Sequence, residues 1–196
     1  MAVSGPRVYL VRHGATEWSV TGQHTGRTDL PLTDEGRLQA QRLGARLAGA
    51  RFALVLVSPL TRAQETANLA GFGDVAEVEP DLMEWDYGDY DGMTAVEIRQ
   101  SRPGWTPWEG GYPGGEALDE LAARAKRVLA RVRAVDGDVA LFAHGHILRV
   151  VAACWLEQPP VEAAHYYLST GSLSVVAWER ETPVIERWNE GCHLED

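Results

Sequence analysis

Cysteine, positive charge and long apolar runs are all scarce in this sequence of 196 residues. The only two cysteines, Cys154 and Cys192, do not have the spacing of metal ligands, so a reduced, cytoplasmic protein is expected. The net charge of −10 lacks the basic surface that is typical of nucleic-acid-binding domains, so no nucleic-acid partner is expected. No run approaches the roughly 20 apolar residues of a membrane span. The N-terminal residues also lack a signal-peptide pattern, so no membrane partner is expected.

Hydrophobic residues make up 45% of the chain, which is enough to bury a substantial core. We therefore predict a single domain over residues 1–196. The segment 103–115, PGWTPWEGGYPGG, is rich in Pro and Gly and carries two tryptophans. It predicts an ordered lid, inserted at about residues 84–115, because long loops with large aromatic side chains are usually functional.

Short apolar runs alternate with amphipathic segments along the chain, which is typical of an α/β fold. Strands are expected at 7–12, 53–57, 75–79, 139–143, 172–179 and 183–188. Helices are expected to start at residue 33, to cover about 60–70 and 116–133, and to end at about 156. The pattern predicts a three-layer sandwich with a mostly parallel central sheet and helices on both faces. In such sheets, ligands bind at the carboxyl ends of the strands.

Polar motifs stand at the expected carboxyl ends of three strands. Arg12-His13-Gly14 ends the first strand, Ser58-Pro59 the second and His144-Gly145 the fourth, while Arg62 follows in the turn after the second. Two guanidinium groups and two imidazoles would then meet at one edge of the sheet. Such a cluster suits a phosphoryl group, because the guanidinium fork matches phosphate geometry. An ordinary surface with scattered arginines is the weaker interpretation.

These residue types meet the needs of phosphoryl transfer, which requires a nucleophile, positive donors and an acid. His13 can supply a neutral ring nitrogen while its other nitrogen is fixed by a backbone carbonyl. Arg12, Arg62 and His144 can supply the donors. Glu84 opens a loop after the third strand and is the candidate acid, although its position alone is equally consistent with a solvated loop carboxylate.

Together these motifs resemble the histidine phosphatase superfamily, in its phosphoglycerate-mutase-like branch. The matching segments are VRHGATEW at 11–18, TGRTDLPLTDEG at 25–36, SPLTRAQETA at 58–67, the Glu of MEWDYGDYDG at 84 and AHGHILR at 143–149. One RHG tripeptide is weak evidence, but these segments occur in the family's order and with compatible strand and helix context. The resemblance covers residues 7 to 180, approximately.

The resemblance implies that His13 is the residue that becomes phosphorylated and that Glu84 is the proton donor. It implies a small phosphorylated metabolite as substrate, and neither a metal nor another cofactor. The rest of the implied phosphate pocket is Arg12, Arg62 and His144. The implied substrate contacts are Ser19, Thr25, Gly26, Tyr87 and the backbone of Gly145. Of these, Ser19 stands where relatives often have Asn, and its reach is shorter.

Departures from the glycolytic mutases favour hydrolysis over mutase activity. Those enzymes carry Arg where this chain has Trp85 and Lys where Ala95 aligns, and 103–115 lacks their paired arginines. These basic residues hold the carboxylate and the second phosphate of phosphoglycerates. The segment EWDYGDYDG and FAHGHILR resemble the subgroup of sedoheptulose-1,7-bisphosphatase and mycobacterial acid phosphatases. A phosphomonoesterase is therefore expected, acting on sugar phosphates or bisphosphates or with broad specificity.

The same motifs also fit other functions. A cofactor-dependent phosphoglycerate mutase and a catalytically silent phospho-ligand-binding module would keep much of the same site. A metal site of His13, His24, His144 and His146 is disfavoured, because a metal and two arginines would compete for one pocket. The sequence leaves open the substrate, a homo-oligomeric state and the roles of His146 and Arg149. The lid tryptophans either form a substrate wall or pin the lid: Trp85, Trp105 and Trp108.

Overall fold

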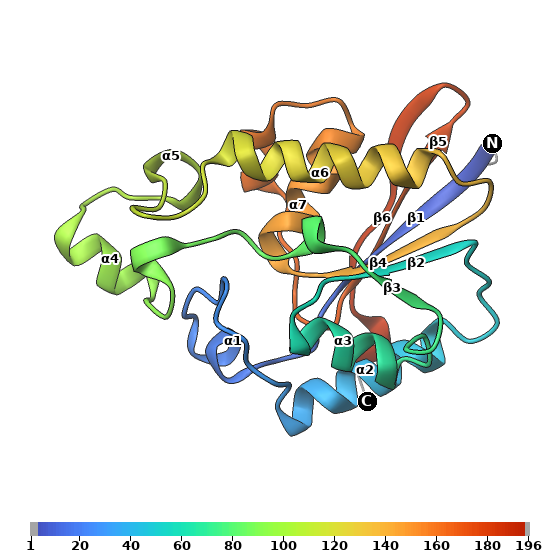
Figure 1. Cartoon of the computed structure of the whole chain (residues 1–196), viewed down its shortest axis with the longest axis horizontal. Helices are drawn as coiled ribbons and strands as arrows, with labels where there is room; N and C mark the ends of the chain where they lie inside the picture. Colours follow the sequence, from blue (N-terminus) through green and yellow to red (C-terminus); the bar gives the residue numbers. More distant parts are fainter. Residues whose placement is uncertain (1–3, 195–196) are drawn as a thin grey trace.

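The computed structural model describes residues 4–194, which fold around a six-stranded sheet with the order β3-β2-β4-β1-β5-β6 (Figure 1). The strands are β1 (Ser4–Arg12), β2 (Leu54–Val57), β3 (Ala76–Val78), β4 (Val139–Ala143), β5 (Leu173–Glu179) and β6 (Thr182–Glu190). Strands β1 to β4 run parallel, and β5 is antiparallel to both β1 and β6. The predicted α/β class and the mostly parallel sheet are confirmed. Residues 1–3 and 195–196 of the predicted domain lie outside the described residues.

Two pairs of helices cover the sheet from opposite sides, as Figure 1 shows. They are α2 (Asp34–Arg46) and α3 (Thr61–Leu69) on one face, and α6 (Leu118–Arg133) and α7 (Gly145–Trp155) on the other. Side chains of a strand alternate between faces, so the fully buried Leu141 packs in the core under α6 and α7, while its neighbour Phe142 packs in the core with α2 and α3. The predicted three-layer arrangement is confirmed.

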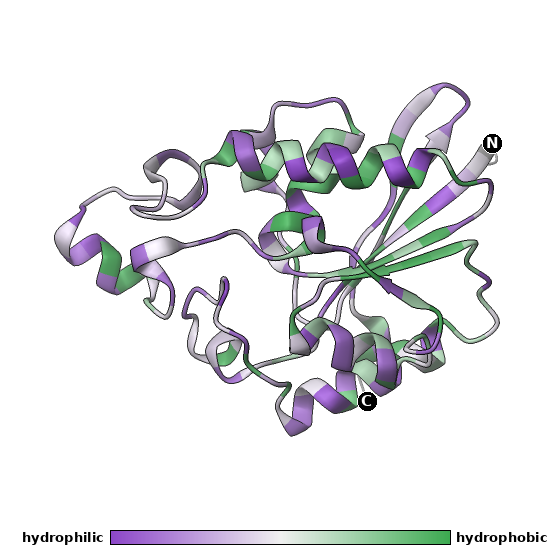
Figure 2. Cartoon of the chain, in the orientation of Figure 1, coloured by the Kyte–Doolittle hydropathy of each residue, from purple (hydrophilic) through white to green (hydrophobic). Residues whose placement is uncertain are grey.

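Local sequence explains the helix boundaries. The Thr33 side chain caps α2 by accepting a hydrogen bond from the Gly36 N–H at 3.1 Å, and acidic residues fill the first turn. Helix α6 carries alternating hydrophilic and hydrophobic bands in Figure 2, as a helix with one buried face does. It begins at Leu118 rather than at Glu116 as predicted, because Glu116 is used in contacts described below. No helix within residues 4–194 is long and apolar enough to cross a membrane.

Short helices make up much of the chain that the sequence patterns left as loops. They are α1 (Glu17–Thr21), α4 (Ala95–Ser101) and α5 (Pro107–Gly110), with 3₁₀ turns at Pro80–Leu82, Gly88–Tyr90, Pro160–His165 and Cys192–Leu194. The region between β3 and α6 extends away from the sheet beside the α1 region (Figure 1). There the His24 N–H donates to the Met93 carbonyl at 2.9 Å, and Gln23 forms an isolated bridge with Thr94. The expected lid region is thus folded against the loop that follows β1.

Candidate active site

The predicted site residues meet where β1, β4 and β2 end side by side. Arg12 pairs with Ala143 in the sheet, and Val57 pairs with Phe142. A cavity of about 230 Å³ opens at this edge. Seven predicted residues line it: Arg12, His13, Ser19, Thr25, Glu84, Tyr87 and Gly145. The other three lie outside the lining: Gly26, Arg62 and His144.

His13 is almost fully buried, with 4% of its surface exposed, and its backbone N–H donates to the Ala143 carbonyl at 3.0 Å. Its Nδ1 lies 2.7 Å from the Gly14 carbonyl, so the neutral ring carries its proton on Nδ1 and leaves a lone pair on Nε2. Burial, together with the charges of Arg62 and Arg12, lowers the pKa of His13 well below 6.5. His13 is therefore a neutral imidazole with a free ring nitrogen beside the cavity.

The loop after His13 is held by close backbone packing. A Cβ on Gly14 would stand 2.2 Å from the carbonyl oxygen of Gly36, so only glycine lets the two backbones approach this closely. The Gly14 N–H donates to the Thr66 hydroxyl at 3.1 Å. These contacts anchor His13 against the first turn of α2 and against α3.

His144 and Arg62 form a buried pair beneath the cavity. Arg62 Nε donates to His144 Nδ1 at 3.1 Å, which places the imidazole proton on Nε2, where it donates to the Ser58 hydroxyl at 2.7 Å. The rings of His13 and His144 lie 5.1 Å apart. Burial first, and then the charge of Arg62, lowers the pKa of His144 well below 6.5. Both nitrogens of His144 are thus engaged, whereas His13 Nε2 has no such partner among the described residues.

Arg62 also shapes the loop that precedes α2. Its terminal nitrogens donate to the carbonyls of Thr25, Gly26 and Thr28, at 3.1, 2.9 and 3.0 Å. The Gly26 N–H itself donates to a carboxylate oxygen of Asp91 at 2.7 Å. Both backbone groups of Gly26 are therefore used to hold the loop in place, whereas Thr25 lines the cavity.

The guanidinium group of Arg12 has more hydrogen-bond donors than partners among the described residues. One terminal nitrogen bonds the Leu168 carbonyl, while Nε is buried without a hydrogen-bond partner in the described part of the chain. Burial lowers the pKa of Arg12. A buried guanidinium donor without a partner is costly, and the positive charge of Arg12 in the cavity lining favours an anion there.

Glu84 is 4% exposed and lies at the N-terminus of α7. Its carboxylate accepts the backbone N–H groups of Trp85, His146 and Ile147 at 2.9, 3.0 and 3.0 Å. A Cβ built on Gly145 would lie 3.5 Å from Arg12 Cζ and 3.7 Å from Glu84 Oε2. Glycine at this position therefore keeps the space between the acid and the guanidinium clear.

Tyr87 and His146 form one wall of the cavity, with the Tyr87 hydroxyl bonded to His146 Nδ1. Burial raises the pKa of Tyr87 well above 10, so the phenol stays neutral. Ser19 lines the cavity too, but its hydroxyl accepts the Thr16 N–H at 2.8 Å in a capping box and also donates to the Thr16 carbonyl at 2.8 Å. The Ser19 side chain is therefore committed to α1.

The tryptophans of the expected lid differ in place. Trp85 and Trp105 are 1% and 3% exposed, line no part of this cavity, and donate their indole N–H to the carbonyls of Glu116 and Gly111. They pack the segment onto the domain, which is the second of the two interpretations left open by the sequence. Trp108 lies under the guanidinium of Arg149, whose Cζ is 4.7 Å from the ring centroid.

Arg149 reaches the cavity, which settles one question that the sequence left open. Its nitrogens donate to the carbonyls of Ala163 and Ala164 at 2.9 and 2.8 Å, so it binds backbone rather than an acidic side chain.

His24 and His146 line the cavity as well. The sequence predicts that His24 lines the entrance of the site and leaves the roles of His146 and Arg149 open, whereas nothing in it singles out Asp91 or Tyr167. Within residues 4–194 no group of three or more His, Cys, Asp or Glu side chains could hold a metal ion.

Comparison with known proteins agrees with this geometry. A model of the histidine phosphatase superfamily (branch 1) matches residues 8–191. This chain belongs to the histidine phosphatase superfamily. An acid phosphatase of Mycobacterium tuberculosis is 39% identical over 91% of this chain and 90% of its own length, and sedoheptulose 1,7-bisphosphatase of Saccharomyces cerevisiae is 37% identical over 76% and 67%. A solved Mycobacterium tuberculosis open-reading-frame product superposes with a TM-score of 0.91 at 36% identity, over 95% and 98% of the two chains.

Three histidines at the cavity of this histidine phosphatase, two buried and one partly buried, make its stability depend on pH. Burial lowers the pKa values of His13, His144 and His146 well below 6.5, while in the unfolded chain they are about 6.5. Below that pH the unfolded state binds more protons than the folded state. We therefore expect the free energy of unfolding to fall, with decreasing pH, by roughly 1.4 kcal/mol per unit for each of these histidines. Urea denaturation at several pH values from 7.5 to 5 measures this slope.

A pair of variants isolates the histidine contribution. His146→Gln should make the slope below pH 6.5 shallower by roughly 1.4 kcal/mol per pH unit. His165→Gln, at an exposed position, should leave the slope as it is. Equal slopes in the unmodified protein and both variants would contradict a lowered pKa of His146 in the folded state.

Proposed function

We propose that this histidine phosphatase is a phosphomonoesterase that passes the phosphate of small esters through a phosphohistidine on His13. The observation that carries the proposal is the state of His13. Its ring is neutral, its Nδ1 proton is held by the Gly14 carbonyl, and its Nε2 has no hydrogen-bond partner among the described residues, while Arg12 and Glu84 line the same cavity. A nucleophile, a positive donor and an acid thus border one cavity.

In the first half-reaction, the lone pair of His13 Nε2 forms a bond to phosphorus as the bond from phosphorus to the ester oxygen breaks. Glu84, in its protonated form, gives its proton to the departing oxygen and becomes a carboxylate. Arg12 donates to the phosphoryl oxygens, and the Arg62–His144 pair beneath the cavity provides positive charge close to them. The products are the free alcohol and phosphorylated His13.

In the second half-reaction, a water molecule attacks the phosphorus and the bond between phosphorus and nitrogen breaks. The Glu84 carboxylate accepts the proton of this water, which returns the acid to its starting form. His13 regains its lone pair, and inorganic phosphate leaves. The backbone donors at the start of α7 hold the Glu84 carboxyl group in one place through both steps.

The rest of the cavity bears on the choice of ester. Arg149 adds a second positive charge to its lining, and Tyr87 and His146 add a neutral wall. The similarity to an acid phosphatase and to a sedoheptulose bisphosphatase supports sugar phosphates and related metabolites as substrates. Trp85 and Ala95, where mutases are basic, support hydrolysis over mutase activity. The lid role of residues 84–115, a homo-oligomeric state and a cytoplasmic location stay predictions.

Release of inorganic phosphate tests the proposal. We expect phosphate release from glycerol 3-phosphate, 3-phosphoglycerate and fructose 1,6-bisphosphate, because water can complete the second step on each. Product analysis by ³¹P NMR follows both phosphate and rearranged esters. Isomerised phosphoglycerate without free phosphate would favour the mutase, and no turnover of any of them would favour the binding module.

A further inference from the structure

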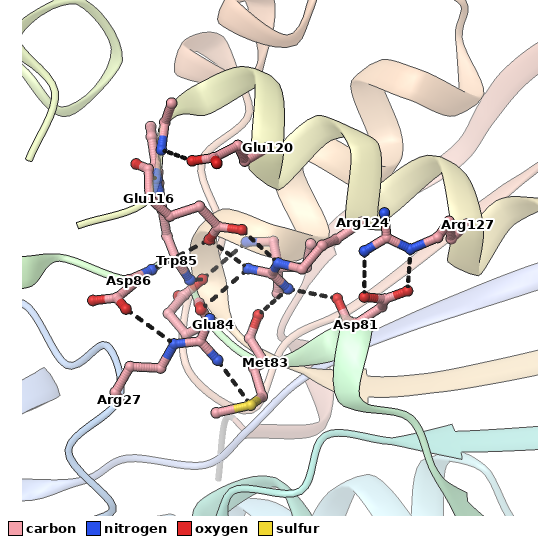
Figure 3. A network of polar contacts seen from close by, with 12 residues as sticks. Arg27, Asp81, Met83, Glu84, Trp85, Asp86, Glu116, Glu120, Arg124 and Arg127 are labelled. Carbon is pink, nitrogen blue, oxygen red and sulfur yellow. Dashed lines mark hydrogen bonds and ion pairs between the residues drawn. The ribbon is translucent and has the colours of Figure 1, made fainter.

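The guanidinium of Arg124 lies against the backbone that carries Glu84, as Figure 3 shows. Arg124 belongs to α6 and is only 9% exposed. One terminal nitrogen donates to the carbonyls of Asp81 and Met83 at 2.6 and 2.9 Å, and the other donates to the Glu84 carbonyl at 3.3 Å. All three acceptors are main-chain atoms, so these bonds fix the path of the backbone itself.

Glu116 binds both Arg124 and the residues that follow Glu84 in the chain. Its carboxylate binds Arg124 at 2.6 and 2.7 Å, in a pair whose side chains are each 11% exposed. Its carbonyl accepts the indole N–H of Trp85 at 2.8 Å, and its N–H donates to the Asp86 carbonyl at 3.0 Å. The residues just before and just after Glu84 are therefore tied to one buried ion pair.

We infer that Arg124 is a positioning residue that holds the Glu84 carboxyl group over the cavity. Arg124 is not among the residues that line the cavity, and its bonds to this segment reach the main chain at Asp81, Met83 and Glu84. The glutamate side chain has three rotatable bonds, and a proton donor must be held within about 0.5 Å of its productive place. The N–H groups of His146 and Ile147 fix the far end of the side chain, and Arg124 fixes the near end.

This inference rests on the proposed function, because it takes Glu84 to be the proton donor. It predicts a particular kinetic signature. Protonation of the leaving oxygen matters for an alkyl ester such as glycerol 3-phosphate and little for p-nitrophenyl phosphate, whose leaving group is stable as an anion. Misplacement of Glu84 should therefore slow the alkyl ester more, whereas general loss of folded enzyme would slow both equally.

Arg127 provides a matched control three residues further along α6. It also binds this segment, through two bonds of 2.7 Å to the Asp81 carboxylate. Those bonds reach a side chain and not the backbone, as Figure 3 shows. The Arg127 side chain is 59% exposed. Solvent screens such a pair, so its loss should leave the Glu84 backbone in place.

The experiment compares kcat/KM on the two esters for Arg124→Met, Arg124→Lys and Arg127→Met, with circular dichroism to check folding. We expect Arg124→Met to lower the ratio of alkyl to p-nitrophenyl activity at least about tenfold. Arg124→Lys keeps the positive charge beside Glu116 but lacks the several guanidinium N–H groups that donate to the carbonyls. It should therefore lower the ratio by a smaller factor than Arg124→Met. Arg127→Met should keep the ratio within about twofold of the unmodified enzyme.

A folded Arg124→Met enzyme with an unchanged ratio would overturn the inference, even if both activities fell together. If that variant does not fold, Arg124→Lys decides by the same criterion. Glu84→Gln separates the two levels of the argument. An unchanged ratio in Glu84→Gln would refute the acid itself, whereas a lowered ratio there beside an unchanged ratio in the Arg124 variants would refute only the positioning role.

Discussion

Turnover of p-nitrophenyl phosphate should fall at least about 10³-fold in His13→Ala, because the variant has no nucleophile to accept the phosphate. His144 cannot take over, since its two ring nitrogens are engaged by Arg62 and Ser58. The phosphate-binding donors remain in the variant, so inorganic phosphate should still bind. Steady-state kinetics measures the first effect and isothermal titration calorimetry the second.

His165→Ala is the control for this experiment, because His165 is exposed and lies outside the cavity. It should retain full turnover. A His13→Ala enzyme that keeps both its fold and its turnover would rule out the covalent mechanism. Loss of turnover together with loss of phosphate binding would instead show that the variant has disrupted the pocket.

Glu84→Gln should lower kcat/KM for glycerol 3-phosphate by roughly 10²- to 10³-fold and for p-nitrophenyl phosphate by less than about tenfold. Glutamine keeps an oxygen that can accept from the N–H groups of His146 and Ile147 but has no proton to give. The difference between the esters is the sign of general acid catalysis. It is measured with the same two substrates under identical conditions.

Glu77→Gln is a suitable comparison, since Glu77 lies on β3 and forms an exposed ion pair with Arg131. Its kcat/KM for both esters should equal that of the unmodified enzyme, because such pairs contribute little. Equal losses on the two esters in Glu84→Gln would show that Glu84 is not the acid.

Much of the fold could be predicted because each strand is a short apolar run and each long helix has a clear apolar stripe. The fully buried strand β4, VALFA, and the capped start of α2 at Thr33 are examples. The placement of His13 and His144 also followed from local sequence. Both come directly after strands that are neighbours in a parallel sheet, so the topology brings them together.

What could not be predicted depends on contacts between distant segments. Arg124 stands on an ordinary amphipathic helix, and nothing near it in the sequence indicates that it binds carbonyls some forty residues earlier. Helix α4 is seven residues long and has one fully buried side chain, Ile98, so it has almost no periodic signal. Asp91 organises the loop at Gly26 across 65 residues of chain.

Two residues predicted to contact the substrate have their polar groups engaged by other parts of the protein. Gly26 resembles a phosphate-binding position, but its N–H is taken by Asp91. The Ser19 hydroxyl is taken by the first turn of α1. Buried polar groups form hydrogen bonds within the fold, and these bonds determine which donors remain available to the substrate. The sequence does not show these partners.

The phosphohistidine on His13 is most directly tested by trapping it in Glu84→Gln. With ³²P-labelled p-nitrophenyl phosphate, the first step needs little acid, while the second step lacks its base, so the intermediate should accumulate. An alkaline quench and peptide mapping should then find one phosphate per enzyme on His13, matched by a burst of p-nitrophenol. A burst without label on His13, or label on another residue, would contradict the account.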